Sequence, residues 1–262
     1  MKKILSNKVA LITGSSEGIG FACAQSLASH GCNLILVSRN KRKLEKATNK
    51  IKTAYKIKCL FVVGDVADPK LPNIVVNEIK VKFKRLDILI NNCGGPPMGS
   101  FLKQNDESWD KAINQNLLSV IRFTNFTFPL MKKNKFGRII NILSILAKEP
   151  TPQMVLSSTT RSGVIAFSKS VSHDLGPYGI TINNICPSGV LTKRFENLLD
   201  QRAKQLNKNI KEFLKERTNT VPIGRFAKPV EIANIVLFLC EKSSSIITGT
   251  SIVADGGQSK SI

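Results

Sequence analysis

A glycine-rich turn near the start of the chain combines the residue types and the spacing that bind a diphosphate. Residues 9–12 form a short apolar run, typical of a strand buried on both faces of a parallel sheet, and the sequence Thr-Gly-Ser-Ser-Glu-Gly-Ile-Gly follows and leads into a helical pattern. Glycines permit a tight turn and the close approach of a ligand, and free N–H groups at a helix N-terminus attract anions. Although a turn that only packs a helix on a strand would look similar, we predict a dinucleotide site held by Gly14, Ser15, Ser16, Gly18, Ile19 and Gly20.

A second chemical signal lies at the end of the next apolar run, residues 33–37. In a doubly wound sheet this strand end lies beside the adenosine ribose, where an acidic residue would accept hydrogen bonds from the 2′-hydroxyl group. Arg39 stands there instead, and a guanidinium suits a 2′-phosphate. The sequence therefore favours NADP(H) over NAD(H). The alternative is that Arg39 is a solvent-exposed residue at the start of the next helix and has no role in binding the cofactor.

Strand and helix patterns alternate along the chain with short turns between them. Further apolar runs lie at 60–63, 86–90, 138–143, 181–186 and 250–254, and helical patterns lie at about 41–54, 69–83, 107–131, 155–176 and 230–240. Such alternation predicts an α/β fold, a Rossmann-type doubly wound parallel sheet of about seven strands flanked by helices. The length of 262 residues suits one dinucleotide-binding domain over 1–262.

The charge is strongly basic, with 39 Lys and Arg against 18 Asp and Glu and a net charge of +21. The basic residues are spread along the chain without interleaved aromatic residues, so lysine-rich solvated faces are favoured over an anionic partner, and we expect no nucleic acid. No apolar run is long enough to cross a bilayer, which predicts a cytoplasmic protein with no membrane contact.

Metal and disulfide sites are not expected. The chain has no CxxC pair and no histidine cluster, and His30 and His173 lie among polar neighbours in helical patterns, which does not favour a catalytic role. The cysteines are predicted to be small buried residues: Cys23, Cys32, Cys59, Cys93, Cys186 and Cys240.

Taken together, several short motifs resemble the short-chain dehydrogenase/reductase family over residues 8–257. Residues 13–20 fit the family's TGxxxGxG sequence, residues 65–66 its adenine-contacting pair and residues 91–94 its NNAG sequence. Asn116 and the segments 137–141, 222–226 and 254–257 extend the resemblance. Residues 92–97 and 148–150 are most similar to the β-ketoacyl-carrier-protein-reductase-like members.

This resemblance implies a nicotinamide cofactor, a substrate and an assembly. The substrate would be a small carbonyl or acyl compound such as a 3-oxoacyl compound, covered by a lid-like helical segment at about 193–220, in a homotetramer or homodimer. Ser188 stands where the family usually has glycine. Beyond the turn, the implied cofactor-binding residues are Arg39, Asp65, Val66, Asn92, Cys93, Gly94, Arg161, Pro187, Ser188 and Thr192.

The implied catalytic residues are Asn116, Ser144, Ser157 and Arg161, and two of them depart from the family. The family has a tyrosine, which protonates the forming alkoxide, and four residues later a lysine, which lowers the pKa of that tyrosine. Alignment on residues 163–169 places Ser157 and Arg161 at these positions. A serine hydroxyl has no accessible ionisation, and an arginine stays charged and cannot act as a general acid.

Three functions fit this replacement. In an altered reductase, Arg161 and Ser144 stabilise the oxyanion, Ser157 holds a water or relays a proton, and NADPH delivers the hydride. A catalytically silent protein would bind NADP(H) or a metabolite without turnover. A lyase on the same scaffold would use Arg161 to hold a carboxylate. Of these three functions, we predict the altered reductase.

Overall fold

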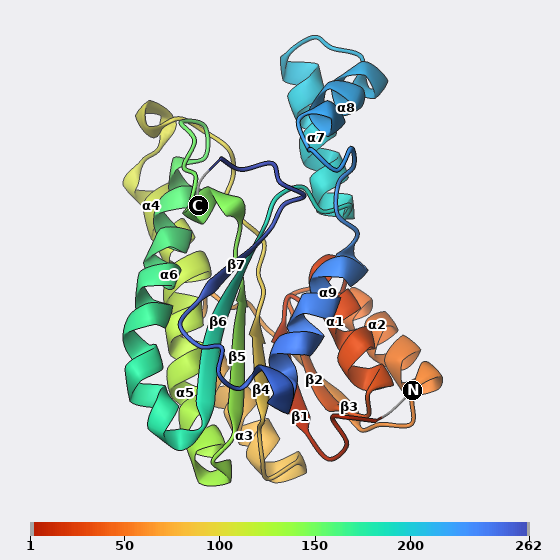
Figure 1. The fold of residues 1–262 in the computed structure, drawn as a ribbon, viewed down its shortest axis with the longest axis vertical. Helices are drawn as coiled ribbons and strands as arrows, with labels where there is room; N and C mark the ends of the chain where they lie inside the picture. Colours follow the sequence, from red (N-terminus) through yellow and green to blue (C-terminus); the bar gives the residue numbers. More distant parts are fainter. Residues whose placement is uncertain (1–2, 261–262) are drawn as a thin grey trace.

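Seven parallel strands form one sheet in the computed structural model, which describes residues 3–260 (Figure 1). The order β3-β2-β1-β4-β5-β6-β7 reverses its direction of winding between β1 and β4. This topology confirms the predicted doubly wound Rossmann-type fold, in which ligands bind at the carboxyl ends of the strands beside the reversal. From β1 to β7 the strands span Val9–Thr13, Asn33–Ser38, Cys59–Val63, Ile88–Asn91, Gly137–Ile142, Ile180–Pro187 and Ser251–Ala254.

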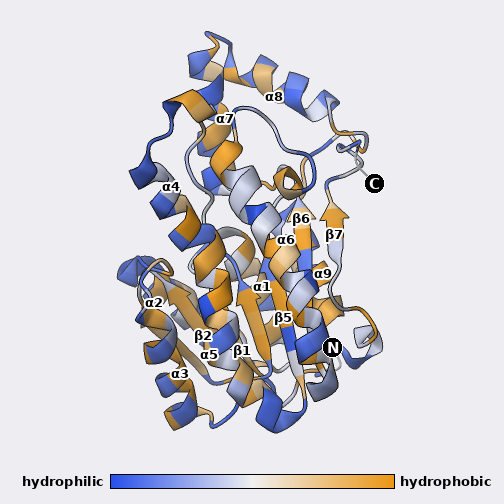
Figure 2. Cartoon of the chain, turned by 90° about the vertical axis from the view of Figure 1, so that its left-hand side faces the viewer, coloured by the Kyte–Doolittle hydropathy of each residue, from blue (hydrophilic) through white to orange (hydrophobic). Residues whose placement is uncertain are grey.

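Helices cover both faces of the sheet (Figure 1). Each buries one stripe of small and apolar residues at intervals of three or four, as Leu44, Ala47 and Ile51 do in α2. Figure 2 shows the corresponding alternation of hydrophobic and hydrophilic residues along α2 and α3, against largely hydrophobic strands. One face packs against α1 (Gly18–Ser29), α2 (Lys41–Ala54) and α9 (Pro229–Cys240), and the other against α3 (Leu71–Lys82), α5 (Ser119–Asn134) and α6 (Val155–Leu175).

The predicted continuous helix over 107–131 is wrong in one respect. A π-helical turn at Asn114–Leu118 separates α4 (Asp106–Ile113) from α5. Such a turn adds a residue to the helical repeat, and the apolar spacing on either side gives no sign of it. Asn116 lies in this turn, so its side chain points where a regular helix would not direct it.

Two helices rise from the carboxyl edge of the sheet, α7 (Lys193–Gln205) and α8 (Ile210–Asn219) (Figure 1). Leu199 on α7 and Phe213 on α8 form a small hydrophobic cluster with Phe226, which lies in the segment between α8 and α9. They occupy the predicted lid-like segment at 193–220, and that they cover a substrate stays a prediction. No helix within residues 3–260 has the length and apolar character needed to cross a membrane.

A row of buried polar side chains fixes α6 to the sheet. Asn91 Nδ2 on β4 donates to Asn141 Oδ1 on β5 at 2.8 Å, and Asn141 Nδ2 donates to Asn184 Oδ1 on β6 at 3.0 Å. Ser168 on α6 accepts from Asn141 at 3.1 Å and donates to Asn184 at 2.9 Å. Because buried polar groups are costly when they lose a partner, this network locks the register of α6 against three strands.

Replacing Asn141 by alanine should lower the free energy of unfolding by roughly 2–4 kcal/mol, because buried groups of Asn91 and Asn184 then lose their partner. Urea denaturation measures the change. The control is Asn73→Ala, since Asn73 is exposed on α3 and its replacement should alter stability by less than about 0.5 kcal/mol. Equal stability of the Asn141 variant and the native protein would contradict the structural role of the network.

Candidate functional site

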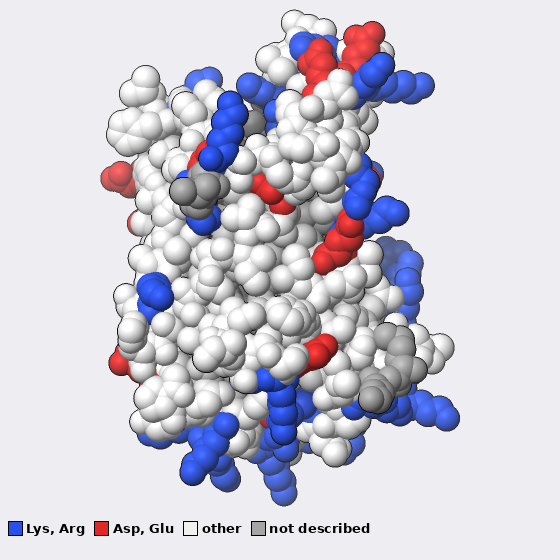
Figure 3. All heavy atoms as spheres, in the orientation of Figure 1, with Lys and Arg blue, Asp and Glu red and all other residues white. Residues whose placement is uncertain are grey.

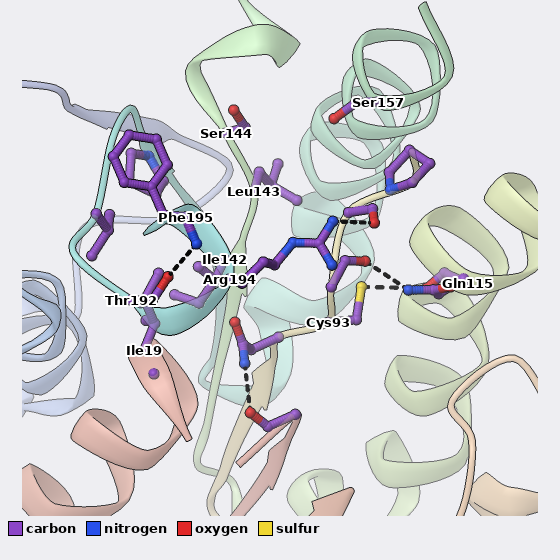
Figure 4. A pocket seen from close by; sticks show the side chains of 18 of the residues that line it. Ile19, Cys93, Gln115, Ile142, Leu143, Ser144, Ser157, Thr192, Arg194 and Phe195 are labelled. Carbon is purple, nitrogen blue, oxygen red and sulfur yellow. Dashed lines mark hydrogen bonds between the residues drawn. The ribbon is translucent and has the colours of Figure 1, made fainter. Parts of the chain in front are cut away.

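A cleft of about 420 Å³ lies at the carboxyl ends of the strands. Figure 4 shows Ile19 at one end of it and Ser144 and Ser157 at the other. The structure therefore brings most of the predicted nucleotide-binding and catalytic residues around one cavity. Those that line it are Gly14, Ser16, Gly18, Ile19, Arg39, Asp65, Val66, Asn92, Cys93, Gly94, Ser144, Ser157, Arg161, Pro187, Ser188 and Thr192.

The glycine-rich turn packs directly against the loop after β4. Gly14 has a φ of +57°, and a Cβ on it would lie 2.4 Å from the Asn92 carbonyl oxygen. Thr13 Oγ1 accepts from Asn92 N at 2.9 Å, and Asn92 Nδ2 donates to Gly14 O at 3.0 Å. The turn thus leaves the N-terminus of α1 facing the cleft without a side chain in front of it, as a diphosphate site requires.

Two residues of the predicted turn do not line the cleft. Ser15 is fully buried, and its hydroxyl donates to Val37 O at 3.2 Å and accepts from Val37 N at 3.0 Å. Gly20 packs against the turn, because a Cβ on it would lie 2.4 Å from Gly14 O. The structure gives both residues a part in tying α1 and β2 to the turn.

The adenosine end of the cleft contains Arg39 and Asp65. Arg39 Nη1 lies 3.5 Å from Asp65 Oδ2, and both side chains are well exposed, at 67% and 43%. A long, exposed ion pair of this kind is weak. The guanidinium of Arg39 is therefore only weakly held by the protein, and that it binds a 2′-phosphate stays a prediction.

Three predicted residues close the cleft on the side of β6. Pro187 ends this strand, and the Ser188 hydroxyl forms a hydrogen bond with Gln258. Thr192 caps α7, its hydroxyl accepting from Phe195 N at 3.2 Å, and its methyl group lies 3.3 Å from the position of a Cβ on Gly18. The start of α7 thereby sits directly over the glycine-rich turn.

Ser157 and Arg161 lie one turn apart on α6 and point into the same cleft. They are only 2% and 8% exposed. Arg161 Nη1 donates to the Leu143 carbonyl oxygen, next to Ser144, whereas its Nε finds no hydrogen-bond partner within residues 3–260. Burial lowers the pKa of the Arg161 guanidinium, and the charge of Arg194 acts in the same direction. The guanidinium nonetheless remains charged at neutral pH.

Asn116 does not line the main cleft. Its Nδ2 donates to Gly94 O at 3.0 Å and to Cys93 Sγ at 3.2 Å, and it borders a much smaller cavity beside Arg161. Burial raises the pKa of the Cys93 thiol, so this group stays neutral. The role that the structure gives Asn116 is to hold the loop after β4. Within the described chain no three His, Cys, Asp or Glu side chains are grouped to hold a metal ion.

The sequence analysis missed Arg194 and Gln115, which also line the cleft. Arg194 Nη2 donates to Gly95 O at 2.5 Å, and Gln115 Nε2 donates to Gly94 O at 2.7 Å. Figure 4 shows the side chain of Arg194 crossing from the Thr192 side toward Cys93 and Gln115. The position of Arg194 two residues after Thr192 was the one available sign that its side chain would reach this cleft.

A nicotinamide dinucleotide fits these residues. A Cβ at Gly14 would overlap Asn92, and a Cβ at Gly18 would contact Thr192. Both residues have positive φ, and the N–H groups at the start of the following helix can bind a diphosphate. Arg39 stands ready for the adenosine end, and Thr192 and the loop after β4 flank the middle of the cleft. The far end holds Ser144, Ser157 and Arg161, where a substrate would lie.

Comparison with known proteins gives a consistent result. Residues 14–259 match the family profile described as enoyl-(acyl carrier protein) reductase. The 3-oxoacyl-[acyl-carrier-protein] reductase FabG of Aquifex aeolicus (strain VF5) is 34% identical over 97% of this chain and 98% of its own length. The NADPH-dependent reductase BacG of Bacillus subtilis (strain 168) is 32% identical over 98% of this chain and 100% of its own. The structure of L-sorbose reductase from Gluconobacter frateurii with NADPH and L-sorbose superposes with a TM-score of 0.95, at 31% identity, over 100% of both chains.

Gly14→Ala should destabilise the protein by roughly 3 kcal/mol or more, because the new methyl group overlaps the Asn92 carbonyl in a left-handed backbone conformation. Thermal unfolding measures the effect. Gly176→Ala is the matched control, since a Cβ at Gly176 meets nothing within 4 Å. Similar melting temperatures for the two variants would contradict the close contact between the turn and the loop after β4.

Proposed function

The chain belongs to the short-chain dehydrogenase/reductase family, and from this premise we propose that it transfers a hydride between NADP(H) and a carbonyl or alcohol substrate. Ser157 and Arg161 take the places of the usual tyrosine and lysine. The observation that carries the proposal is the position of the Arg161 guanidinium, beside Ser144 and in the same cleft as the phosphate-binding turn.

Several features support NADP(H) as the cofactor. Arg39 is exposed and only weakly paired at the strand end where the adenosine ribose lies in this fold. BacG is named as an NADPH-dependent reductase, and the L-sorbose reductase structure contains NADPH. A guanidinium favours the additional phosphate of NADP(H) through charge-assisted hydrogen bonds.

The proposed chemistry assigns one task to each residue at the far end of the cleft. When bound, NADPH supplies the hydride to the carbonyl carbon of the substrate. Ser144 donates a hydrogen bond to the carbonyl oxygen, and Arg161 stabilises the negative charge that develops there. Ser157 holds a water molecule, which exchanges protons with the solvent and protonates that oxygen. The net proton has to come from the solvent through this water, because neither Ser157 nor Arg161 can give up a proton and remain deprotonated near neutral pH.

The proposed substrate is a small carbonyl or acyl compound. We include 3-oxoacyl compounds because the relative FabG is named as a 3-oxoacyl-[acyl-carrier-protein] reductase. The helices α7 and α8 stand at the mouth of the cleft and would act as its lid. A homotetramer or homodimer through α5 and α6 is the proposed assembly, and Phe126 on α5 is 36% exposed there.

The protein should oxidise NADPH in the presence of at least one member of a panel of aldehydes, ketones, oxo acids and 3-oxoacyl thioesters. Arg161→Ala should lower the rate at least about 100-fold, since loss of an oxyanion donor costs 10²–10³ in rate. Arg217→Ala, on the exposed side of α8, serves as the control. Tight NADPH binding with no turnover would favour a silent binding protein, and product formation without nucleotide would favour a lyase.

Arg39→Gln should weaken NADPH binding roughly 10- to 100-fold and leave NADH binding unchanged, because charge-assisted hydrogen bonds to the 2′-phosphate are worth about 1.5–3 kcal/mol. Titration calorimetry with both nucleotides measures this selectivity. Arg42→Gln is the control, because Arg42 is exposed on α2 and does not line the cleft. An unchanged NADPH affinity in the Arg39 variant would refute the assignment.

A further inference from the structure

Two arginine side chains converge on the open face of Gly95 inside the cleft. Arg161 Nη2 lies 3.1 Å, and Arg194 Nη2 lies 3.5 Å, from the position that a Cβ on Gly95 would take. They come from opposite sides of the cleft, since Arg161 lies on α6 and Arg194 lies at the start of α7. Figure 4 shows the side chain of Arg194 crossing the cleft. Because the two guanidinium groups approach the same point, a single small anion can accept hydrogen bonds from both.

No carboxylate of residues 3–260 forms an ion pair with either arginine. The two acids that line the cleft lie beside other basic residues: Asp65 is 3.5 Å from Arg39, and Glu17 is 2.9 Å from Lys43. The nearest ionisable neighbour is Cys93, and burial raises the pKa of its thiol, which leaves it uncharged. The positive charge of the pair is therefore uncompensated by the protein.

Two lysines of the lid differ in this respect. Lys204 lies 2.8 Å from Asp200, and Lys208 lies 2.6 Å from Glu216. Figure 3 shows acidic and basic side chains next to one another on α7 and α8. These two lid lysines therefore have acidic partners on the lid itself, whereas Arg161 and Arg194 have none among the described residues.

The Arg161 guanidinium is costly in this arrangement without a ligand, because it is buried and lies close to the charge of Arg194. Arg161 is 8% exposed, and its Nε has no partner in the described chain. Burial of a charge without an opposite charge is unfavourable, and two like charges side by side add to the cost. A carboxylate between them would supply both the missing charge and the missing acceptors, and arginine binds carboxylates with paired hydrogen bonds.

We propose that Arg161 and Arg194 bind a carboxylate of the substrate, so that the protein acts on oxo acids in preference to neutral ketones or esters. The inference rests on the proposed function and narrows its substrate class. The carboxylate would lie on the side of Ser144 and Ser157, away from the diphosphate corner at Gly14. A carbonyl close to the carboxylate, as in a 2- or 3-oxo acid, lets the five donors of Arg161 serve both groups.

Titration calorimetry on the NADPH-saturated protein tests the proposal with acetoacetate and its uncharged counterpart, methyl acetoacetate. We expect acetoacetate to bind at least about tenfold more tightly, and Arg194→Gln to abolish this preference. Arg202→Gln, near the end of α7 and not part of the cleft lining, should retain it. Because Arg194 is exposed at the mouth of the cleft, its replacement should leave the melting temperature unchanged. Equal binding of acid and ester by the native protein would overturn the proposal.

The other anion that could lie between the arginines is the diphosphate of the nucleotide, and a second titration separates the two. If Arg194→Gln weakens the binding of NADPH and inorganic pyrophosphate tenfold or more and leaves acetoacetate unaffected, the pair serves the cofactor and the proposal fails. Selective acetoacetate binding that depends on Arg194, with no NADPH oxidation by any member of the carbonyl panel, would uphold the carboxylate site and refute the proposed oxidoreductase function. With turnover, Arg194→Gln should raise the KM for acetoacetate at least about tenfold, with a much smaller change in kcat.

Discussion

The close approach of three backbone segments at the junction of β1 and β4 is the constraint on which the cleft depends. A Cβ at Gly14 or at Gly20 would lie 2.4 Å from a carbonyl oxygen of a neighbouring segment. Only because neither residue has a side chain can the turn, the first turn of α1 and the loop after β4 meet, and Asn92 then ties them by hydrogen bonds to Thr13 and Gly14. One packing requirement thus shapes the wall of the cleft that the turn and the loop after β4 form together.

The position of α6 follows from a different kind of interaction. Buried amides on β4, β5 and β6 hold Ser168, and with it the whole helix, in one register. Ser157 and Arg161 lie farther along the same helix, so the network that stabilises the fold also orients the residues proposed for chemistry. On the proposed function, the exchange of tyrosine and lysine for serine and arginine at these positions changes the chemistry of the site and leaves this network in place.

The sequence predicted those features that depend on local patterns. Apolar runs and glycine spacing predicted the parallel sheet, which the topology confirms, and they predicted the glycine-rich turn and Arg39, which both line the cleft; that these residues bind phosphate groups stays a prediction. The π-helical turn at Asn114–Leu118 was not predicted, since it alters the helical repeat without changing the residue types around it. The contact of Ser15 with β2 and the convergence of Arg161 and Arg194 were missed for a common reason: both are set by tertiary packing between segments far apart in the sequence.

On the proposed mechanism, the absence of the tyrosine phenol and the presence of the paired guanidinium groups are linked, because both concern how the developing alkoxide is stabilised. A tyrosine lowers the barrier by giving a proton to the developing alkoxide, which requires a tuned pKa. Arginine has no accessible pKa for this purpose, but its charge stabilises an oxyanion throughout the reaction. Because Arg161 is buried, its interaction with a developing negative charge is stronger than it would be in water. An acidic substrate would offset the cost of holding Arg161 and Arg194 together before the reaction begins, and protonation could then follow from solvent.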